Sequence, residues 1–279
     1  MFGKVISEIK GWNRIRRKRR RVARNPKIEY AHKFGVMGIM KNETMNIDEW
    51  VSHYLSVGAG KIFLIDNGST DDTVTKAKVW VAKGVLELVE YTKSHNQTQH
   101  YWAAFVEMEI AQKCEWLLVA DLDEFWFCPS GETMAKCLDG FLGLDVIYAN
   151  WRMFGSNGLE KHPRSIRQAF TNCAPGLSAH TERKYICRTS VVKSGGTLGI
   201  HVVSHACSSR TVSENARFHL NHYPIQSLEF FQIVKITRGD ASTSLSDNVR
   251  DMDYFYRYDA LCDGKDNLLA NLVASGHIE

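Results

Sequence analysis

The sequence predicts an α/β fold in which strands alternate with helices around a largely parallel sheet. Between residues 34 and 120, short apolar runs alternate with segments whose apolar residues recur at helical spacing, and polar turns follow the apolar runs. Strands separated by helices imply right-handed βαβ crossovers, which pair the strands in parallel. With 279 residues, of which 44% are hydrophobic and 24% charged, the chain is long enough for a sizeable core.

The elements follow one another in the order that such a sheet needs. The apolar runs expected to form strands are residues 34–40, 61–65, 85–89, 115–120 and 146–149. The segments expected to form helices are residues 47–55, 99–114, 254–258 and 268–273. Between the second and third strands, Ser69 or Thr70 is placed to cap a helix whose first turn contains Asp71 and Asp72.

The net charge of +4 is the sum of two unlike parts. Residues 1–27 contain 11 Lys or Arg and one acid, which gives +10, and the other 24 bases and 30 acids give −6. The first dozen residues carry an apolar stripe at helical spacing, and residues 14–24 contain eight bases in eleven positions. An amphipathic helix followed by a polybasic run favours an anionic membrane surface, although a solvated tail fits the same residues equally well.

The composition disfavours several classes of protein. No run approaches the roughly 20 apolar residues of a membrane-spanning helix, and the N-terminus lacks an apolar signal-peptide core. The seven cysteines form neither a C-x-x-C pair nor a zinc-finger spacing, so a reducing compartment is expected. We therefore expect a cytoplasmic protein, attached peripherally at the inner face of the cell membrane through residues 1–27.

Polar clusters follow three of the expected strands, at residues 41–43, 66–72 and 121–123. Any one such cluster is more often a helix cap than a binding site. The carboxyl ends of parallel strands share one edge of the sheet, and ligands of α/β proteins bind there. The coincidence of three clusters at equivalent strand ends therefore indicates a site.

Asp121 and Asp123 form a D-x-D pair at the end of the strand expected at 115–120. In extended geometry, residues i and i+2 project to the same side, so both carboxylates can approach one ion. Mg²⁺ and Mn²⁺ take oxygen ligands in proteins and bridge to substrate phosphates. The spacing is weak evidence alone, and it gains weight from the two other polar strand ends.

These residues and several downstream motifs resemble glycosyltransferase family 2-like enzymes, close to the family 92 branch. The matching segments are residues 41–43, 47–53, 61–73, 121–125, 151–158, 184–188 and 220–223, followed by Ser227, Phe230, Lys235, Arg238 and Gly239. The resemblance spans roughly residues 34–240. It implies a GT-A fold over residues 28–240, between the basic arm and a helical extension at 241–279.

The resemblance also implies that a sugar moves from a nucleotide donor, expected to be a UDP-sugar, to a hydroxyl of a glycan or lipid-linked acceptor. Glu43 and Asp66 would contact the base and the ribose, and Asp123, supported by Asp121, would hold Mn²⁺ or Mg²⁺ on the diphosphate. Such a cation stabilises the charge of the departing nucleoside diphosphate. The residues expected to bind the nucleotide sugar are Lys41, Asn42, Glu43, Asp66, Asn67, Ser69, Asp121, Lys184 and Arg188. Surface ion pairing explains Lys184 and Arg188 equally well.

A histidine from late in the domain is expected to complete the metal site. His201 and His205 share a face of a strand-like segment but lie too far apart to chelate as a local pair. We favour His201 because it follows a glycine-rich turn, although a structural histidine fits that position as well. His219 and His222 rank below it.

The acceptor and the catalytic base are less clearly marked. Trp151, Arg152, Phe154 and Ser156 follow the strand at 146–149 and offer an aromatic platform with polar donors, while core packing explains the two aromatic residues equally well. An inverting transfer, which we expect, needs a carboxylate base. Glu182 and Asp240 are candidates by position, because the Gln-x-x-Arg-Trp signature of many family 2 enzymes is absent from the sequence. The expected catalytic residues are thus Asp123, Glu182 and Asp240.

The favoured interpretation is a metal-dependent glycosyltransferase of cell-surface polysaccharide or lipopolysaccharide synthesis. Two alternatives fit parts of the sequence. A nucleic-acid-binding protein would use the basic arm, but the −6 body offers no second basic face, so no nucleic acid partner is expected. A non-catalytic GT-A-like domain would bind sugar nucleotides without transferring the sugar.

Overall fold

The structure is a computed structural model that describes residues 29–92, 96–178, 182–238 and 250–278. The expected membrane arm at 1–27 and the candidate base Asp240 lie outside these described residues. Residues Ala31–Glu279 form one compact unit, and the fold below is the fold of that unit.

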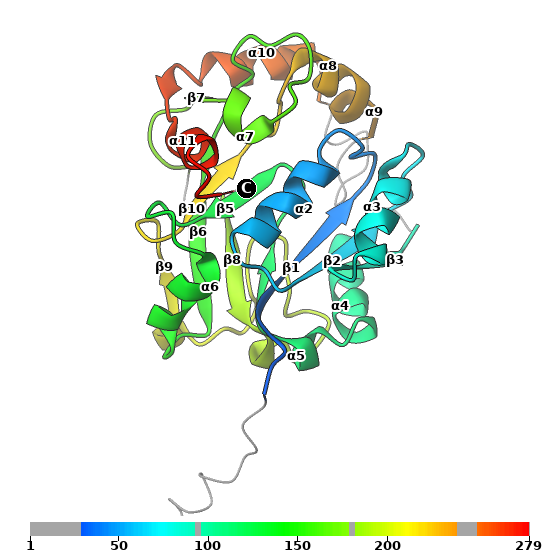
Figure 1. Cartoon of the computed structure of the whole chain (residues 1–279), viewed down its shortest axis with the longest axis vertical. Coiled ribbons are helices and arrows are strands. Elements are labelled where there is room, and N and C mark those ends of the chain that lie inside the picture. Colours follow the sequence, from blue (N-terminus) through cyan, green and yellow to red (C-terminus); the bar gives the residue numbers. More distant parts are fainter. Residues whose placement is uncertain (1–28, 93–95, 179–181, 239–249, 279) are drawn as a thin grey trace, which may run out of the picture. The chain divides into compact units, whose positions relative to one another are not determined.

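In the described part of the chain, nine strands form one mixed sheet (Figure 1). They are β1 (His32–Met40), β2 (Lys61–Asp66), β3 (Leu86–Glu90), β4 (Cys114–Val119), β5 (Glu124–Phe127), β6 (Val146–Met153), β8 (Arg183–Arg188), β9 (Thr211–Ser213) and β10 (His219–His222). The order is β3-β2-β1-β4-β8-β6-β10-β5, and β9 pairs with β6. The strands β1 to β4 pair in parallel, as the sequence predicts, whereas β8 is antiparallel to both of its neighbours.

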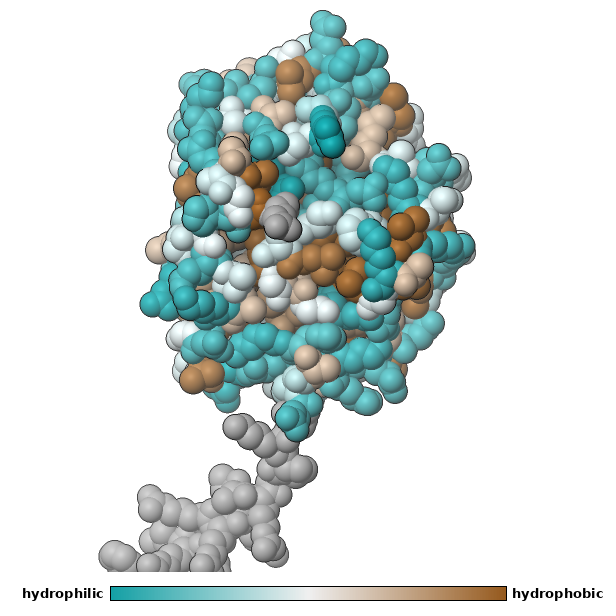
Figure 2. Space-filling model, viewed as in Figure 1, coloured by the Kyte–Doolittle hydropathy of each residue, from teal (hydrophilic) through white to brown (hydrophobic). Residues whose placement is uncertain are grey.

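Helices pack on both faces of the sheet (Figure 1). They are α2 (Ile47–Ser56), α3 (Thr73–Ala82), α4 (Gln97–Glu107), α5 (Ile110–Lys113), α6 (Met134–Cys137), α7 (Ile166–Ala169), α8 (Leu228–Phe230), α9 (Ile236–Arg238), α10 (Met252–Ala260) and α11 (Leu268–Ala274). A π-helical turn, Phe231–Lys235, joins α8 to α9. None of the described helices has the length and apolar character needed to cross a membrane. The face shown in Figure 2 is mostly hydrophilic, with apolar residues in small separate patches.

Strand β1 is buried on both faces. Phe34 and Val36 pack in one core cluster with Trp50 of α2, whereas Met37 packs on the opposite face with Tyr101 of α4. A strand covered by helices on both sides needs apolar residues at every position rather than at alternate ones. This explains why the segment 34–40 reads as a continuous apolar run.

Three local expectations differ from the structure. The helix expected at 99–114 divides into α4 and α5, because Glu109 has a φ of +50° and a left-handed residue interrupts a helix. Asp72 is the N-cap of α3, and Ser69 does not cap it; Oγ of Ser69 instead accepts a hydrogen bond from the N–H of Asn42 (3.0 Å). The segment 201–205 is a loop rather than a strand, so the face-sharing argument for His201 does not apply.

The C-terminal segment shares the core of the same unit. Leu269 of α11 and Ile278 lie in the core cluster that contains Trp50, and α11 packs against α7. The short strand β11 (Gly264–Lys265) pairs with β7 (Asn172–Cys173). The extension expected at 241–279 is thus largely helical where it is described, and it is not a separate body.

Gly38 lies in β1 beside the chain that leads from β4 to the D-x-D pair. A Cβ at this position would lie 2.9 Å from the carbonyl oxygen of Ala120 and 3.3 Å from the ring of Trp50. Interiors are packed too closely to absorb such an atom without backbone movement.

We therefore expect Gly38→Ala to lower the free energy of unfolding by about 1–3 kcal/mol, as overpacking does in other cores, in urea denaturation experiments. Gly143→Ala is the matched control, because a Cβ there meets no heavy atom within 4 Å among the described residues. Equal stability of the two variants would show that the close approach at β1 is not a constraint.

Candidate active site

The sheet brings polar strand ends to one edge. The carboxyl ends of β1, β2, β3 and β4 meet there because these strands are parallel. Strand β8 runs antiparallel to β4, so its first residues, including Lys184, lie at the same edge. Strands β6 and β10 also end there, and β5 begins there, because His222 of β10 pairs with Glu124 of β5. Such an edge is where α/β proteins bind their ligands.

Hydrogen bonds tie the turn after β1 to the turn after β2. Besides the bond from Asn42 to Ser69, the N–H of Glu43 donates to Oγ1 of Thr73 (2.7 Å). The buried carboxylate of Asp66 accepts the N–H of Ser69 (3.1 Å), which fixes the second turn. The first two clusters that the sequence singled out therefore form one continuous surface.

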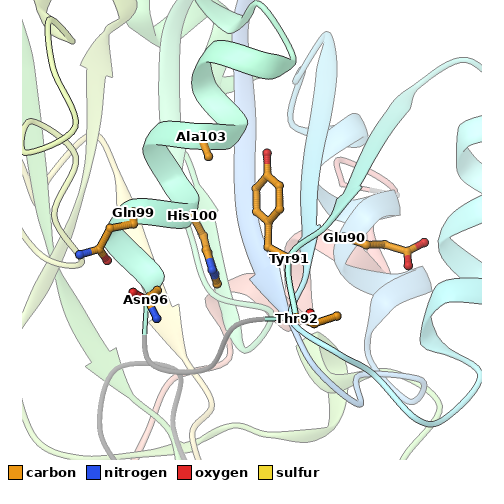
Figure 3. Close-up of a pocket in the computed structure, with 7 residues that line it drawn as sticks. All are labelled: Glu90, Tyr91, Thr92, Asn96, Gln99, His100 and Ala103. Atoms are coloured by element: carbon orange, nitrogen blue, oxygen red, sulfur yellow. The ribbon is translucent and has the colours of Figure 1, made fainter.

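A pocket of about 480 Å³ lies beside this surface, between the end of β3 and the start of α4 (Figure 3). The N–H of Tyr91 donates to the carbonyl oxygen of Asp66 (2.8 Å), and the carbonyl oxygen of Tyr91 accepts from Nδ2 of Asn67 (2.6 Å). The rings of Tyr91 and His100 lie 5.3 Å apart in the pocket. The Asp66 turn is thus bonded to a residue that lines the pocket, and the flat rings in that pocket suit an aromatic base.

Three carboxylates lie together after β4, and two buried lysines neutralise them. Nζ of Lys184 lies 2.8 Å from Oδ2 of Asp121 and 3.7 Å from Oε1 of Glu124. Nζ of Lys235 lies 2.5 Å from Oδ2 of Asp123. Asp121 is the most exposed of the five side chains, at 32%, and the other four are at most 8% exposed.

Burial and neighbouring charges set the ionisation of this group. Burial alone would raise the pKa of Asp123, but Lys235 and His222 together outweigh it and hold that pKa well below its usual range. Burial raises the pKa of Glu124 well above its usual range, and the charges of Asp121 and Asp123 add to the rise against the effect of Lys184. Burial would lower the pKa of Lys184, yet the two carboxylates beside it raise that pKa. At neutral pH the site therefore holds a charged Asp123 and a charged Lys184.

Asp123, Glu124 and His222 are the described residues whose ligand atoms could hold a metal ion here, since one atom of each lies within 4.8 Å of the others. Oδ1 of Asp123 lies 3.6 Å from Nε2 of His222 and receives no hydrogen bond from any described residue. A buried oxygen without a hydrogen-bond donor is uncommon and calls for another partner. Carboxylate oxygen and imidazole are ligands that suit Mn²⁺, so these residues fit a divalent cation.

The indole of Trp151 lies against this group. Its Nε1–H donates to Oε1 of Glu124 (2.8 Å), and its ring lies 4.3 Å from the ring of His222 and 5.2 Å from that of His201. Nδ1 of His201 is 3.0 Å from the carbonyl oxygen of Arg183, and burial lowers the pKa of His201. His222, rather than His201, is thus the histidine that the structure places beside Asp123.

The sequence pattern of glycosyltransferase family 92 matches residues 34–254, which is most of the chain. The chain belongs to glycosyltransferase family 92. This membership agrees with the mixed α/β sheet described above, and the predicted GT-A fold class is confirmed.

Known family 92 proteins are distant and longer relatives. One from Oryza sativa subsp. japonica is 22% identical over 206 residues, which cover 72% of this chain and 35% of that protein. One from Ricinus communis is 23% identical over 233 residues, which cover 73% of this chain and 37% of that protein. The chain therefore spans little more than a third of the length of these curated relatives.

Solved structures resemble the chain more loosely. TarS 1–349 of S. aureus in complex with UDP-GlcNAc is 16% identical, with 86% of this chain and 71% of that chain covered and a TM-score of 0.46. GalNAc-T7 with UDP, GalNAc and Mn²⁺ is 10% identical, with 90% and 55% covered and a TM-score of 0.43. At such TM-scores neither structure places a ligand in this family 92 chain.

Arg188 lies away from the site, although it shares β8 with Lys184. Four positions along a strand correspond to about 13 Å, so the two side chains lie near opposite ends of the strand. The guanidinium of Arg188 pairs with Glu115 (2.5 Å) and lies over the ring of Trp116 (4.3 Å). Of the two bases expected to clamp a diphosphate, the structure brings only Lys184 to the D-x-D pair.

The four expected acceptor residues divide into two groups. Phe154 and Ser156 are each 1% exposed; the Phe154 ring packs against Tyr223 (4.7 Å), and the N–H of Ser156 donates to Asp259 (2.6 Å). These two side chains therefore serve packing rather than acceptor contact. Trp151 and Arg152 are half-buried: the indole of Trp151 lies next to Glu124, whereas the guanidinium of Arg152 pairs with Asp266 (3.2 Å).

Glu182 is exposed and lies directly before β8. Its carbonyl oxygen accepts the N–H of Trp151 (3.1 Å). Burial raises the pKa of Tyr254, and the charges of Asp123 and Glu182 both add to that rise. Glu182, the candidate base among the described residues, therefore lies beside Trp151 through its backbone bond.

Sequence reasoning gave no chemical role to Glu124 or Lys235 and ranked His222 below His201, although His222 is the histidine that lies beside Asp123. Glu124 directly follows the D-x-D pair and precedes three aromatic residues. The usable signal was strand pairing: an antiparallel match of 124–127 with 219–222 sets His222 opposite Glu124. Lys235 belonged to the matched motifs, but no local pattern relates it to Asp123, which lies 112 positions earlier.

His53 of α2 supports the strand that follows the D-x-D pair. Its Nε2 lies 2.8 Å from the carbonyl oxygen of Trp126 in β5, and its Nδ1 lies 3.3 Å from the guanidinium of Arg167. Nδ1 accepts from Arg167 and Nε2–H donates to Trp126, so both nitrogens are used by the neutral ring. Burial and the charge of Arg167 lower the pKa of His53 well below its usual range.

This buried neutral ring predicts a loss of stability in acid. Below about pH 6.5 the unfolded chain binds a proton at His53 that the folded chain does not, so the free energy of unfolding falls by about 1.4 kcal/mol per pH unit for this one proton. His53→Gln keeps a donor for Trp126, and we expect it to remove this part of the slope in urea unfolding between pH 6.5 and pH 5.

The exposed His277 provides the control, since His277→Gln should keep the full slope. An unchanged slope in His53→Gln would mean that the buried ring takes up a proton in the folded state.

Proposed function

We propose that this family 92 protein is a metal-dependent glycosyltransferase that moves a sugar from a UDP-sugar to a hydroxyl of a glycan or lipid-linked acceptor. The observation that carries the proposal is that two acidic sites lie at one edge of the sheet. Asp66 ends β2, and Asp121, Asp123 and Glu124 follow β4. These two strands flank β1, so their ends lie about 10 Å apart. That spacing suits a nucleoside at one end and its diphosphate at the other.

The nucleoside would lie over the joined turns after β1 and β2. Carboxylates of Glu43 and Asp66 accept hydrogen bonds from ribose hydroxyls and from the N3–H of uracil, and amides such as that of Asn67 donate to uracil oxygens. The pocket that holds Tyr91 and His100 adjoins this surface and offers flat rings to a base. Lys41, Asn42 and Ser69 shape the same surface.

The diphosphate would lie over the D-x-D pair. Asp123 and His222 would hold Mn²⁺ or Mg²⁺ with Glu124 or Asp121, and the ion when bound stabilises the negative charge of the departing UDP. Lys184 adds a fixed positive charge at the same place, because its ammonium is held by Asp121. Arg188 has no part in this proposal.

The acceptor would approach over the partly exposed Trp151 and Arg152. Glu182 would take the proton of the attacking hydroxyl, and Asp240 remains the other candidate base. A single base acting on a direct displacement gives inversion at the sugar carbon. A lipid-linked acceptor in polysaccharide or lipopolysaccharide synthesis accords with the basic arm.

Asp123→Asn tests the catalytic proposal because it removes the charge and keeps the shape. With Mn²⁺ and a panel of UDP-sugars, we expect UDP release to fall at least about 100-fold, the usual scale for a lost electrostatic group. Asp139→Asn is the control, because Asp139 is an exposed residue that pairs with Lys33 and should leave release unchanged.

Full UDP release by a folded Asp123→Asn variant would contradict the metal role. Tight binding of a UDP-sugar by the wild type, without release across many acceptors, would instead identify a non-catalytic sugar-nucleotide-binding domain.

The proposal extends to residues 1–27, whose +10 charge and apolar stripe support attachment of a cytoplasmic enzyme to an anionic membrane. We expect the full chain to co-sediment with vesicles of phosphatidylcholine and phosphatidylglycerol but not with phosphatidylcholine alone. Deletion of 1–27 or high salt should abolish the binding, since salt screens exposed charges. Co-sedimentation that survives the deletion would exclude the arm as the anchor.

A further inference from the structure

Each carboxylate oxygen of Asp123 faces a different position that a cation could occupy. Its Oδ2 pairs with the ammonium of Lys235 at 2.5 Å, while its Oδ1 faces His222 at 3.6 Å. Oδ1 receives no hydrogen bond from the described residues, so it is the oxygen open to a metal ion. A divalent cation and Lys235 therefore compete for the charge of one carboxylate.

The charges of the group nearly balance before any ion binds. Among the described residues, three acids, Asp121, Asp123 and Glu124, face the two buried lysines, which leaves a formal charge of −1 when all three acids are ionised and 0 when Glu124 is protonated. A divalent ion would change this to +1 or +2 in a largely buried place. Buried unbalanced charge is costly, so the ion needs either the withdrawal of a lysine or an anion that arrives with it.

The two lysines differ in how easily their ammonium groups could move away from the carboxylates. Lys184 belongs to the interior of the sheet, where its backbone pairs with Ala149 of β6 and its side chain contacts both Asp121 and Glu124. Lys235 ends the π-helical turn Phe231–Lys235, and such turns occur frequently at functional sites. Rotation about the side-chain bonds of Lys235 would move its ammonium without disturbing a strand.

We infer that Lys235 is an internal counter-cation that keeps a divalent ion off Asp123 until a nucleoside diphosphate is present, and that its ammonium then moves from Asp123 to a phosphate oxygen. The inference rests on the metal-dependent donor binding proposed above. It adds that Lys235 makes the ion and the donor bind together. Such coupling is reciprocal, so each ligand strengthens the binding of the other.

Binding of Mn²⁺ tests this without any turnover. Free Mn²⁺ is followed by electron paramagnetic resonance during titration of the full chain, with and without UDP. Lys235→Met should bind Mn²⁺ alone at least tenfold more tightly than the wild type, and UDP should then add little. Lys235→Arg keeps the charge and should behave as the wild type does. Lys78→Met, at an exposed position of α3, is the matched control and should change nothing.

Mn²⁺ affinity of Lys235→Met equal to or weaker than that of the wild type would overturn the inference. Because loss of Lys235 leaves Asp123 without its counter-ion, folding of the variant is checked by circular dichroism. If it does not fold, the wild type decides: Mn²⁺ affinity for the protein that UDP does not raise also overturns the inference. Coupled binding of Mn²⁺ and UDP without release from any UDP-sugar would sustain the inference and reject the transferase.

Discussion

The arrangement of the site depends on the ion pairs of the buried Lys184 ammonium. Lys184 lies in the sheet and contacts both Asp121 and Glu124, so it fixes the start of the D-x-D segment and the residue that directly follows that segment. Breaking a buried ion pair costs about 3–5 kcal/mol, because the remaining charge stays out of water. The carboxylate of Asp123 is thereby held between residues whose positions the sheet has already set.

The sheet supplies that lysine through a change of strand direction. Parallel pairing of β1 to β4 gathers carboxyl ends, and the antiparallel β8 then adds an amino end, with Lys184, to the same edge. Strands β10 and β5 are also antiparallel, so the end of β10 meets the start of β5 and His222 lies opposite Glu124. Parallel strands alone would collect turns at this edge, whereas the mixed half of the sheet also brings buried side chains of opposite charge to it.

Local sequence patterns predict those parts of the structure that neighbouring residues determine. The strands β1 to β4 and the helix α2 were predicted closely, and Asp66, Asp121 and Asp123 lie at strand ends because each motif adjoins its own strand. Phe154 and Ser156 looked accessible because burial depends on partners such as Tyr223 and Asp259, far along the chain. Lys184 and Arg188 share a strand, and only its direction shows which end reaches the site. His222 and Lys235 depend on strand pairing and helix docking that no local spacing encodes.

Trp151 lies between the D-x-D group and the position proposed for the acceptor. Its Nε1–H donates to Glu124, its ring lies on His222, and its backbone N–H bonds the carbonyl of Glu182. The same residue is also partly exposed where an acceptor would approach. An acceptor that packs on this indole would therefore contact a side chain already hydrogen-bonded to Glu124, one of the candidate metal ligands. In the proposed reaction one residue would thus set both the geometry of acceptor binding and that of the D-x-D group, and a change at Trp151 would alter both together.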